Sequence, residues 1–211
     1  MKFKHIIWDY DGTLFDSYPI MANSFNDALK ERGIVEPIST IISYMRVSMG
    51  DAGKHYEEKY QIDDAFWERF AILNKKSEIE NTKPFDGIVE LCNTICEYGG
   101  KNYLLTHRGE SAIYFMEKYG LLANFTELIT SKKNFPRKPS PDAILYLMNK
   151  YEFLHDESII IGDRDLDILS GKNAGIHTCY FTNQSEKSDI AEFNINHFSE
   201  LYKILDISYP K

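Results

Sequence analysis

Two carboxylates stand two residues apart near the start of the chain, in the stretch IIWDYDGTLFDS (residues 6–17). An apolar run leads into Asp9, and Asp11 follows with Gly12 and Thr13 directly behind it. Like charges held this close together cost free energy unless something cationic offsets them. The spacing therefore predicts a cationic partner for Asp9 and Asp11 at the end of a buried strand.

Further polar residues follow apolar runs later in the chain. They are Thr106 in LLTHR, Lys138 in KPSPD, and Asp163 and Asp167 in GDRDLD. Ligands of an open α/β sheet bind beyond the carboxyl ends of its strands, so we expect these side chains to share one site. Each of them alone is typical of a cap or a solvated surface, and their common position at strand ends favours function.

The types of these residues suit phosphoryl chemistry. Asp9, Asp11 and Asp163 offer hard oxygen ligands and an excess of negative charge, which predicts Mg²⁺ bound by few carboxylates together with substrate and water. A lysine and a hydroxyl suit an anionic, oxygen-rich group. A carboxylate can also act as a covalent nucleophile through an aspartyl phosphate.

The elements that must position these residues are predicted from hydrophobic patterning. Continuous apolar runs, typical of buried parallel strands, cover residues 3–9, 101–106, 126–130, 158–163 and 176–181. Helical spacing lies between strands, over residues 85–98 and 141–151. Strands that alternate with helices predict an α/β fold with a doubly wound parallel sheet.

The interval between the first two motifs breaks this alternation. Its apolar residues recur at helical spacing, so we expect a helical domain over residues 17–84, inserted into a core domain made of 1–16 and 85–211. Gly50 and Gly53 in YMRVSMGDAGKHY predict a loop between two helices of the insertion.

Composition narrows the classes of function. A hydrophobic fraction of 43% in 211 residues is enough for a sizeable core, and a net charge of -8 without a basic cluster argues against nucleic-acid binding. The apolar runs are too short for a membrane span, and the start lacks a signal-peptide pattern, so we expect a cytoplasmic protein. Monomer and homodimer both stay open.

The cysteines give no sign of a metal or disulfide framework. The chain has three cysteines, Cys92, Cys96 and Cys179, and an odd number argues against a disulfide scaffold. Cys92 and Cys96 alternate with apolar residues at helical spacing, so we expect them to pack in the core.

The four motifs together carry a family resemblance. DYDGTLFDS, LLTHR, KPSPD and IGDRDLDILSGKNAG resemble the motifs of the haloacid dehalogenase (HAD) superfamily of hydrolases, and the insertion resembles the helical cap of its phosphoglycolate phosphatase and β-phosphoglucomutase subgroup. The resemblance covers essentially the whole chain. It implies a Mg²⁺-dependent phosphatase acting on a small phosphorylated metabolite, of the phosphoglycolate or sugar phosphate type. The dehalogenating branch lacks the second aspartate, so the presence of Asp11 favours phosphoryl transfer.

The resemblance also implies roles for individual residues. Asp9 would be the nucleophile. Asp11 would protonate the leaving oxygen and then activate water, and would ligate Mg²⁺ through its backbone carbonyl. Thr106 and the backbone N–H of His107 would bind phosphoryl oxygens, and Lys138 would neutralise charge beside Asp9.

The fourth motif would complete the metal site. Asp163 would be its direct ligand, and Asp167 would support it. Two residues depart from the common pattern: His107 stands where Asn is frequent, and Arg164 stands where a small residue is frequent. Both would lie at the rim of the site and leave the substrate open.

Recognition of the rest of the substrate is expected from the inserted domain. With Mg²⁺ and Lys138 present, the core site is near neutral before a phosphate dianion arrives. Cations of the insertion are the candidates for discrimination among metabolites, namely Arg46, Lys54 and His55.

Two alternatives remain beside the phosphatase. A phosphomutase on the same scaffold would keep the same four motifs. A receiver-like phosphoacceptor signalling domain would also combine a doubly wound sheet with an acidic cluster, a hydroxyl and a lysine. Receivers are usually single compact domains, and an insertion of nearly 70 residues argues against one.

Overall fold

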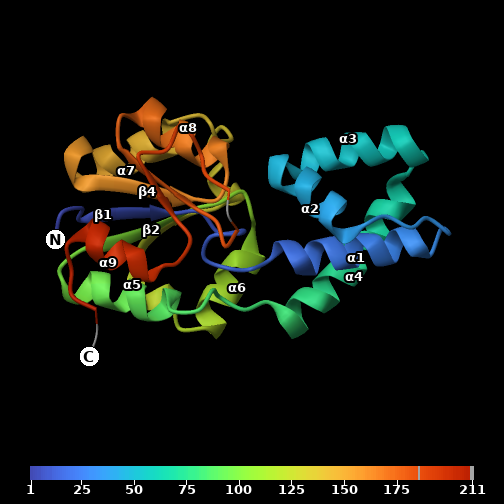
Figure 1. Ribbon diagram of the computed structural model, residues 1–211, viewed down its shortest axis with the longest axis horizontal. Helices are drawn as coiled ribbons and strands as arrows, with labels where there is room; N and C mark the ends of the chain where they lie inside the picture. The colour runs from blue at the N-terminus through green and yellow to red at the C-terminus, as the bar shows by residue number, and fades with distance from the viewer. Residues whose placement is uncertain (185, 210–211) are drawn as a thin grey trace. The chain divides into compact units, whose positions relative to one another are not determined.

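The computed structural model describes residues 1–184 and 186–209. Two compact units make up the chain: Met1–Phe15 with Pro84–Lys211, called the core unit here, and Asp16–Lys83, called the helical unit (Figure 1). The boundaries predicted from the sequence lie within one residue of these. That the helical unit acts as a cap stays a prediction.

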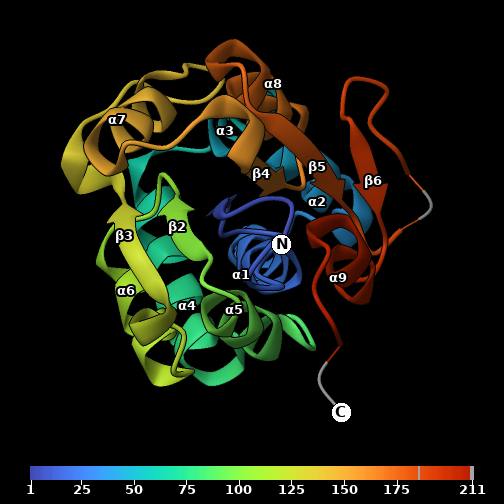
Figure 2. The same ribbon diagram turned by 90° about the vertical axis from the view of Figure 1, so that its left-hand side faces the viewer.

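The core unit contains a six-stranded parallel sheet (Figure 2). Its strands are β1 (His5–Trp8), β2 (Lys101–Leu105), β3 (Phe125–Ile129), β4 (Ser158–Gly162), β5 (His177–Phe181) and β6 (Phe193–Ile195). Their spatial order is β3-β2-β1-β4-β5-β6. Each of the five predicted strands is present, with both ends within two residues of the prediction. The sequence did not predict β6, which has only three residues.

In the described part of the core unit, four helices lie between strands in the chain, and a fifth follows the last strand. The four are α5 (Ile88–Glu97), α6 (Glu110–Lys118), α7 (Asp142–Tyr151) and α8 (Asp165–Ala174), and the fifth is α9 (Ser199–Leu205). Short 3-10 turns cover Leu122–Asn124, Ser131–Lys133 and His155–Glu157.

The two faces of the sheet bury alternate residues of the same strand. Ile6 and Trp8 of β1 share one hydrophobic cluster with residues of α5, α6 and α9. Ile7, between them, shares another cluster with residues of α7 and with Ala174 at the end of α8. Because successive side chains of a strand point to opposite faces, this pattern places helices on both sides of the sheet. The predicted α/β fold with a doubly wound sheet is confirmed.

The cysteines differ from one another in their surroundings. Cys92 and Cys179 are buried, and Cys96 is exposed, so the prediction of core packing was wrong for Cys96. Helical spacing alone could not separate the two positions on α5. The amide of Asn102 donates to the Cys96 sulfur at 3.5 Å, which keeps this side chain at the border of the core.

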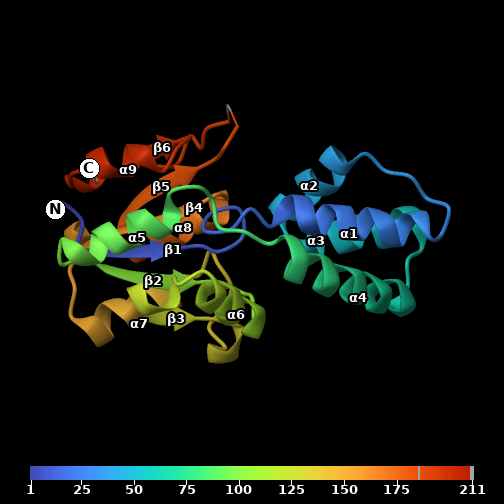
Figure 3. The ribbon, with the colours of Figure 1, turned by 90° about the horizontal axis from the view of Figure 1, so that it is seen from below.

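The helical unit is built of helices (Figure 3), and it has a hydrophobic core of its own. Its helices are α1 (Tyr18–Lys30), α2 (Ile38–Val47), α3 (Met49–Tyr60) and α4 (Asp64–Asn81). Phe25 of α1 lies at the centre, with ring centroids 5.0 Å from Tyr56 and 4.9 Å from Phe66. Such aromatic packing holds the four helices together independently of the sheet.

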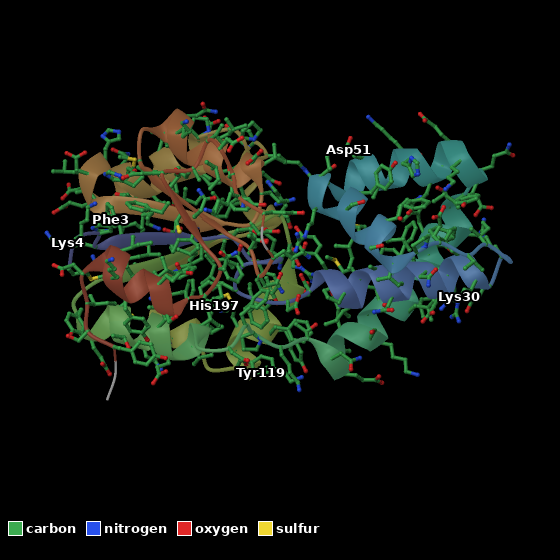
Figure 4. All side chains as sticks on the ribbon, in the orientation of Figure 1. Phe3, Lys4, Lys30, Asp51, Tyr119 and His197 are labelled. Atoms are coloured by element: carbon green, nitrogen blue, oxygen red, sulfur yellow. The ribbon has the colours of Figure 1, made fainter. Side chains whose placement is uncertain are left out.

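The loop predicted around Gly50 and Gly53 is absent, and both glycines lie inside α3. Only extended Ser48 separates α2 from α3, and its hydroxyl accepts a hydrogen bond from the backbone N–H of Asp51 at 2.9 Å, which caps the helix. Asp51, in the first turn of α3, is labelled in Figure 4. A Cβ atom at Gly53 would lie 3.1 Å from the Trp67 ring. Gly53 therefore serves close packing between helices, which sequence patterning does not distinguish from a turn.

Within the described ranges, no helix combines the length and the apolar character that crossing a membrane requires.

Candidate active site

Neighbouring strands bring the predicted site residues to one edge of the sheet. Asp9 follows β1, Thr106 follows β2 and Asp163 follows β4, and β1 lies between the other two strands. The backbone N–H of Asp9 still bonds Ile161 at 2.9 Å, as that of Thr106 bonds Ile129. The backbone of the first residue after each of these two strands is therefore hydrogen-bonded to the neighbouring strand. This bond fixes the backbone position from which the side chain extends.

A buried lysine joins two aspartates at this edge. Lys138 Nζ donates to Asp9 Oδ1 and to Asp167 Oδ1, both at 2.5 Å. The three side chains are 2%, 3% and 0% exposed for Lys138, Asp9 and Asp167. An ion pair so well shielded from water is costly to break by removing one partner.

The charges of this cluster do not balance. Burial raises the pKa of Asp9, and the Asp167 carboxylate adds to the rise against the pull of Lys138. Burial alone would lower the pKa of Lys138, but Asp167 and Asp9 outweigh it and raise that pKa, so the ammonium stays charged. Three carboxylates, counting that of Asp163, face two cations, because the Arg164 guanidinium lies 3.7 Å from Asp167 Oδ2 in addition to the ammonium. The excess negative charge is one that a further cation would offset.

The same edge offers ligands for that cation. Carboxylate oxygens of Asp9, Asp163 and Asp167 lie within 4.8 Å of one another, and all three residues are buried. Asp9 Oδ2 is buried and has no hydrogen-bond partner among the described residues. Buried carboxylate oxygens left for a ligand suit a hard divalent ion such as Mg²⁺, so the residues present fit the predicted metal.

Both carboxylate oxygens of Asp167 accept hydrogen bonds from other residues of the site. Oδ1 accepts from Lys138, and Oδ2 accepts from the backbone N–H of Arg164 at 3.1 Å. The carboxylate also lies against Gly162, where a Cβ atom would come within 2.3 Å of Asp167 Cβ. Gly162 therefore makes room for Asp167, and the arrangement agrees with a supporting role for this carboxylate.

The loop after β2 carries the hydroxyl and the imidazole that the sequence singled out. Thr106 Oγ1 accepts from the backbone N–H of Arg108 at 3.1 Å. His107 Nε2 accepts from the backbone N–H of Lys138 at 3.3 Å. Burial lowers the pKa of His107 to about 4, aided by Lys138 and Arg137. The imidazole is therefore neutral and helps to position the loop of Lys138.

Asp11 lies beside a residue that the sequence analysis did not single out. Arg108 Nε donates to both carboxylate oxygens of Asp11, at 2.8 and 2.9 Å. The guanidinium also lies over the Tyr10 ring, 5.1 Å from its centroid. A cation two residues after Thr106 in LLTHR was the available signal, but no spacing rule connects it to Asp11 across 97 positions of sequence.

The predicted cations of the insertion all lie in the helical unit, on helices. Arg46 is in the last turn of α2, with its guanidinium 5.6 Å from the centroid of the Tyr18 ring. His55 of α3 stacks on Tyr44 at 3.9 Å between ring centroids, and Lys54 is exposed. Their contact with a substrate stays a prediction.

Comparison with known proteins agrees with this fold. The family model described as haloacid dehalogenase-like hydrolase matches residues 6–181. Phosphoglycolate phosphatase of Aquifex aeolicus is 28% identical over 209 residues, covering 95% of this chain and 96% of the relative. Pyrophosphatase PpaX of Halalkalibacterium halodurans is 26% identical over 187 residues, covering 84% of this chain and 83% of the relative. The crystal structure of a hydrolase from Streptococcus pneumoniae TIGR4 is 30% identical with a TM-score of 0.70, covering 98% of this chain and 100% of that one.

The chain belongs to the haloacid dehalogenase-like hydrolase family, because the family model spans most of its length. The resemblance inferred from the four motifs is confirmed, and so is the expectation of an enzyme of this superfamily whose relatives bear phosphatase names. The family match does not support the receiver-like alternative.

Proposed function

We propose that this protein is a Mg²⁺-dependent phosphatase that hydrolyses a small phosphorylated metabolite through an aspartyl phosphate on Asp9. The observation that carries the proposal is how the two oxygens of the Asp9 carboxylate are hydrogen-bonded. Lys138 holds Oδ1, while Oδ2 is buried and without a hydrogen-bond partner among the described residues. A nucleophile needs one oxygen oriented and the other available, and this carboxylate meets both needs.

In the proposed first step, Asp9 Oδ2 forms a bond to phosphorus while the bond from phosphorus to the leaving oxygen breaks. Asp11 gives a proton to that oxygen. Lys138 remains bound to Asp9 Oδ1 and offsets charge on the phosphoryl group. Thr106 and the backbone N–H of His107 bind the phosphoryl oxygens.

In the second step, Asp11 takes a proton from water, the water oxygen bonds to phosphorus, and the bond to Asp9 breaks. The chain is thereby returned to its starting state with inorganic phosphate released. Asp163, the backbone carbonyl of Asp11 and the Asp9 oxygen that is not bonded to phosphorus would hold Mg²⁺, with Asp167 behind them. Bound Mg²⁺ supplies charge that stabilises the phosphoryl oxygens.

The substrate is proposed to be a phosphomonoester of the phosphoglycolate or sugar phosphate type. Relatives named phosphoglycolate phosphatase and pyrophosphatase support a small phosphorylated molecule. The helical unit is proposed as a cap that discriminates among such molecules through Arg46 and Lys54, with His55 as a further candidate. Closure of a cap would also exclude bulk water from the reacting group.

The experiment is phosphate release from a panel of phosphorylated metabolites with Mg²⁺, run on the wild type and on Asp9→Asn. Enhancements of phosphate-monoester hydrolysis reach roughly 10²¹, so loss of the nucleophile should leave turnover below detection. Asp156→Asn is the matched control, because it removes an exposed carboxylate just before the opposite end of β4. Substantial turnover by a folded Asp9→Asn protein would exclude the covalent mechanism. Isomerised substrate without phosphate release would indicate a phosphomutase instead.

A further inference from the structure

The ion pair between Asp11 and Arg108 differs from the rest of the site in its access to solvent. The side chains of Arg108 and Asp11 are 13% and 21% exposed, whereas those of Asp9 and Lys138 are 3% and 2% exposed. Arg108 Nη2 lies 2.8 Å from Asp11 Oδ1, in addition to the two bonds from Nε. A dissolved ligand can therefore reach this pair without disturbing the buried cluster.

The pairing conflicts with the role proposed for Asp11. Both carboxylate oxygens accept N–H donors from Arg108, yet the acid must turn one oxygen toward the leaving group and donate a proton there. The hydrogen bonds from Arg108 to the Asp11 carboxylate must therefore break during the reaction. An arginine left without its anion in a partly desolvated site costs free energy unless another anion replaces the carboxylate.

The position of Arg108 indicates where the replacing anion would lie. Its backbone N–H is bonded to Thr106 Oγ1, so the residue belongs to the loop that borders the phosphoryl group. Its guanidinium already contacts the carboxylate that must reach the leaving oxygen. An anion that replaces the Asp11 carboxylate at Arg108 would thus belong to the leaving group, one or two atoms from the phosphoester oxygen.

We propose that Arg108 is a specificity-determining residue that exchanges Asp11 for a carboxylate of the substrate's leaving group. The inference rests on the phosphatase function proposed above. A planar carboxylate matches the fork of the guanidinium as the Asp11 side chain does. A substrate that carries one releases Asp11 for catalysis and keeps Arg108 paired. A neutral substrate releases Asp11 without replacing the hydrogen bonds that Arg108 gave to it, and so reacts more slowly.

The test compares two substrates that differ only at the group in question. They are 2-phosphoglycolate, which has a carboxylate, and 2-hydroxyethyl phosphate, which has a neutral hydroxymethyl group in its place. Each is assayed with the wild type, Arg108→Gln and Arg108→Lys. Arg69→Gln is the matched control, since Arg69 also holds a carboxylate by Nε and Nη2, that of Glu31, at 2.8 and 2.6 Å in the helical unit.

Arg108→Gln should lower kcat/KM for 2-phosphoglycolate by about 10- to 100-fold, the usual worth of a hydrogen bond to a charged group. For 2-hydroxyethyl phosphate, the change should stay within about threefold, since no anion is lost and Asp11 is freed. Arg108→Lys should lie between, because it keeps the charge and loses the fork. Arg69→Gln should leave the ratio of the two substrates unchanged.

Binding gives a second readout that needs no turnover. In an Asp9→Asn background, calorimetry should show that Arg108→Gln weakens 2-phosphoglycolate binding and hardly changes 2-hydroxyethyl phosphate binding. Equal losses for both substrates, or none for either, would overturn the inference and leave Arg108 as a structural partner of Asp11. If Arg108→Gln does not fold, Arg108→Lys decides by the same ratio.

The two proposals fail in different ways. A wild-type protein that hydrolyses no member of the panel overturns the phosphatase function and this inference with it. A wild-type protein that turns over both test substrates, with a ratio that Arg108 variants do not alter, overturns the inference alone.

Discussion

Two ion-pair clusters at the same edge of the sheet use similar groups in different surroundings. In the cluster of Asp9, Lys138 and Asp167, the side chains are at most 3% exposed, and one ammonium bonds two carboxylates. In the pair of Asp11 and Arg108, the side chains are 21% and 13% exposed, and the guanidinium donates to the Asp11 carboxylate. A buried charge without its partner is far more costly than a partly solvated one.

The difference in burial indicates that the two clusters serve different roles in turnover. Groups that must keep one geometry through every turnover belong in the buried cluster, since no solvent competes for their hydrogen bonds there. Groups that must change partner during turnover belong where solvent or a ligand can replace the lost bond. The predictions below would break or sharpen this comparison.

The largest effect is expected from removing the metal. Exhaustive dialysis against EDTA should reduce phosphatase activity to background, and Mg²⁺ should restore it, because the buried carboxylates repel one another and the incoming phosphate. Two like charges 4 Å apart interact by about 4 kcal/mol at an effective dielectric of 20. Mg²⁺ should also raise the Tm of the wild type, and much less that of Asp163→Asn. Full activity after chelation would contradict the proposed metal.

Removing the buried cation should affect both activity and stability. Lys138→Met leaves Asp9 and Asp167 without their shared donor, and we expect the free energy of unfolding to fall by about 3–5 kcal/mol. The matched control is Lys132→Met, which removes an exposed pair with Glu110 and should change the free energy of unfolding far less. Urea unfolding measures both variants. Similar losses in the two would show that burial does not separate the clusters as described.

The proposed cap should affect substrate choice alone. Arg46→Ala or Lys54→Ala should lower kcat/KM for the best metabolite by roughly ten- to a hundred-fold, as expected for a lost charged contact. Activity on p-nitrophenyl phosphate should change little, because this compound offers no charged group beyond the phosphate. Parallel losses on both compounds, or no loss on either, would remove these residues from substrate recognition.

The smallest effect concerns a histidine outside the site. Burial lowers the pKa of His5 from 6.5 to about 4, aided by Lys101. The unfolded chain therefore binds more protons between these values, and stability falls as the pH drops from about 6.5 toward 4. We expect about 1 kcal/mol, less than the full shift implies, because solvent screens part of it.

His5→Phe should flatten this pH dependence while keeping the stack on Phe153, which lies 4.2 Å away between ring centroids. The loss of Tm between pH 7 and pH 5 should be smaller by about 2–4 °C in the variant. His107 is present in both proteins, so its contribution to the pH dependence of stability cancels in the comparison. An identical pH profile would show that folding does not lower the pKa of His5.

The sheet and the buried cluster could be predicted from sequence because their signals are local. Apolar runs such as SIIIG mark strands buried on both faces, and parallel strands place the residues that follow them at one edge. Asp9, Thr106 and Asp163 were predictable for this reason. Strand β6 gave no such run, since FNI is short and two of its residues are only partly buried.

The remaining features depend on contacts between distant segments. The bond from Arg108 to Asp11 and that from the Lys138 backbone to His107 depend on how loop residues orient once the sheet has formed. Gly53 misled the sequence analysis, because glycine marks both turns and close packing, and only the position of Trp67 separates the two. Patterning therefore predicts which strand ends meet, but not which side chains pair there.

The central claim is that Asp9 accepts the phosphoryl group, and chemical trapping tests it most directly. The enzyme is mixed with Mg²⁺ and the best substrate of the panel, quenched in acid during turnover, reduced with borohydride and digested for peptide mass spectrometry. The account predicts that Asp9 is converted to homoserine only in the presence of substrate, and that Asp11 is unchanged. Unmodified Asp9 in a sample that is turning over, or modification of a different residue, would contradict it.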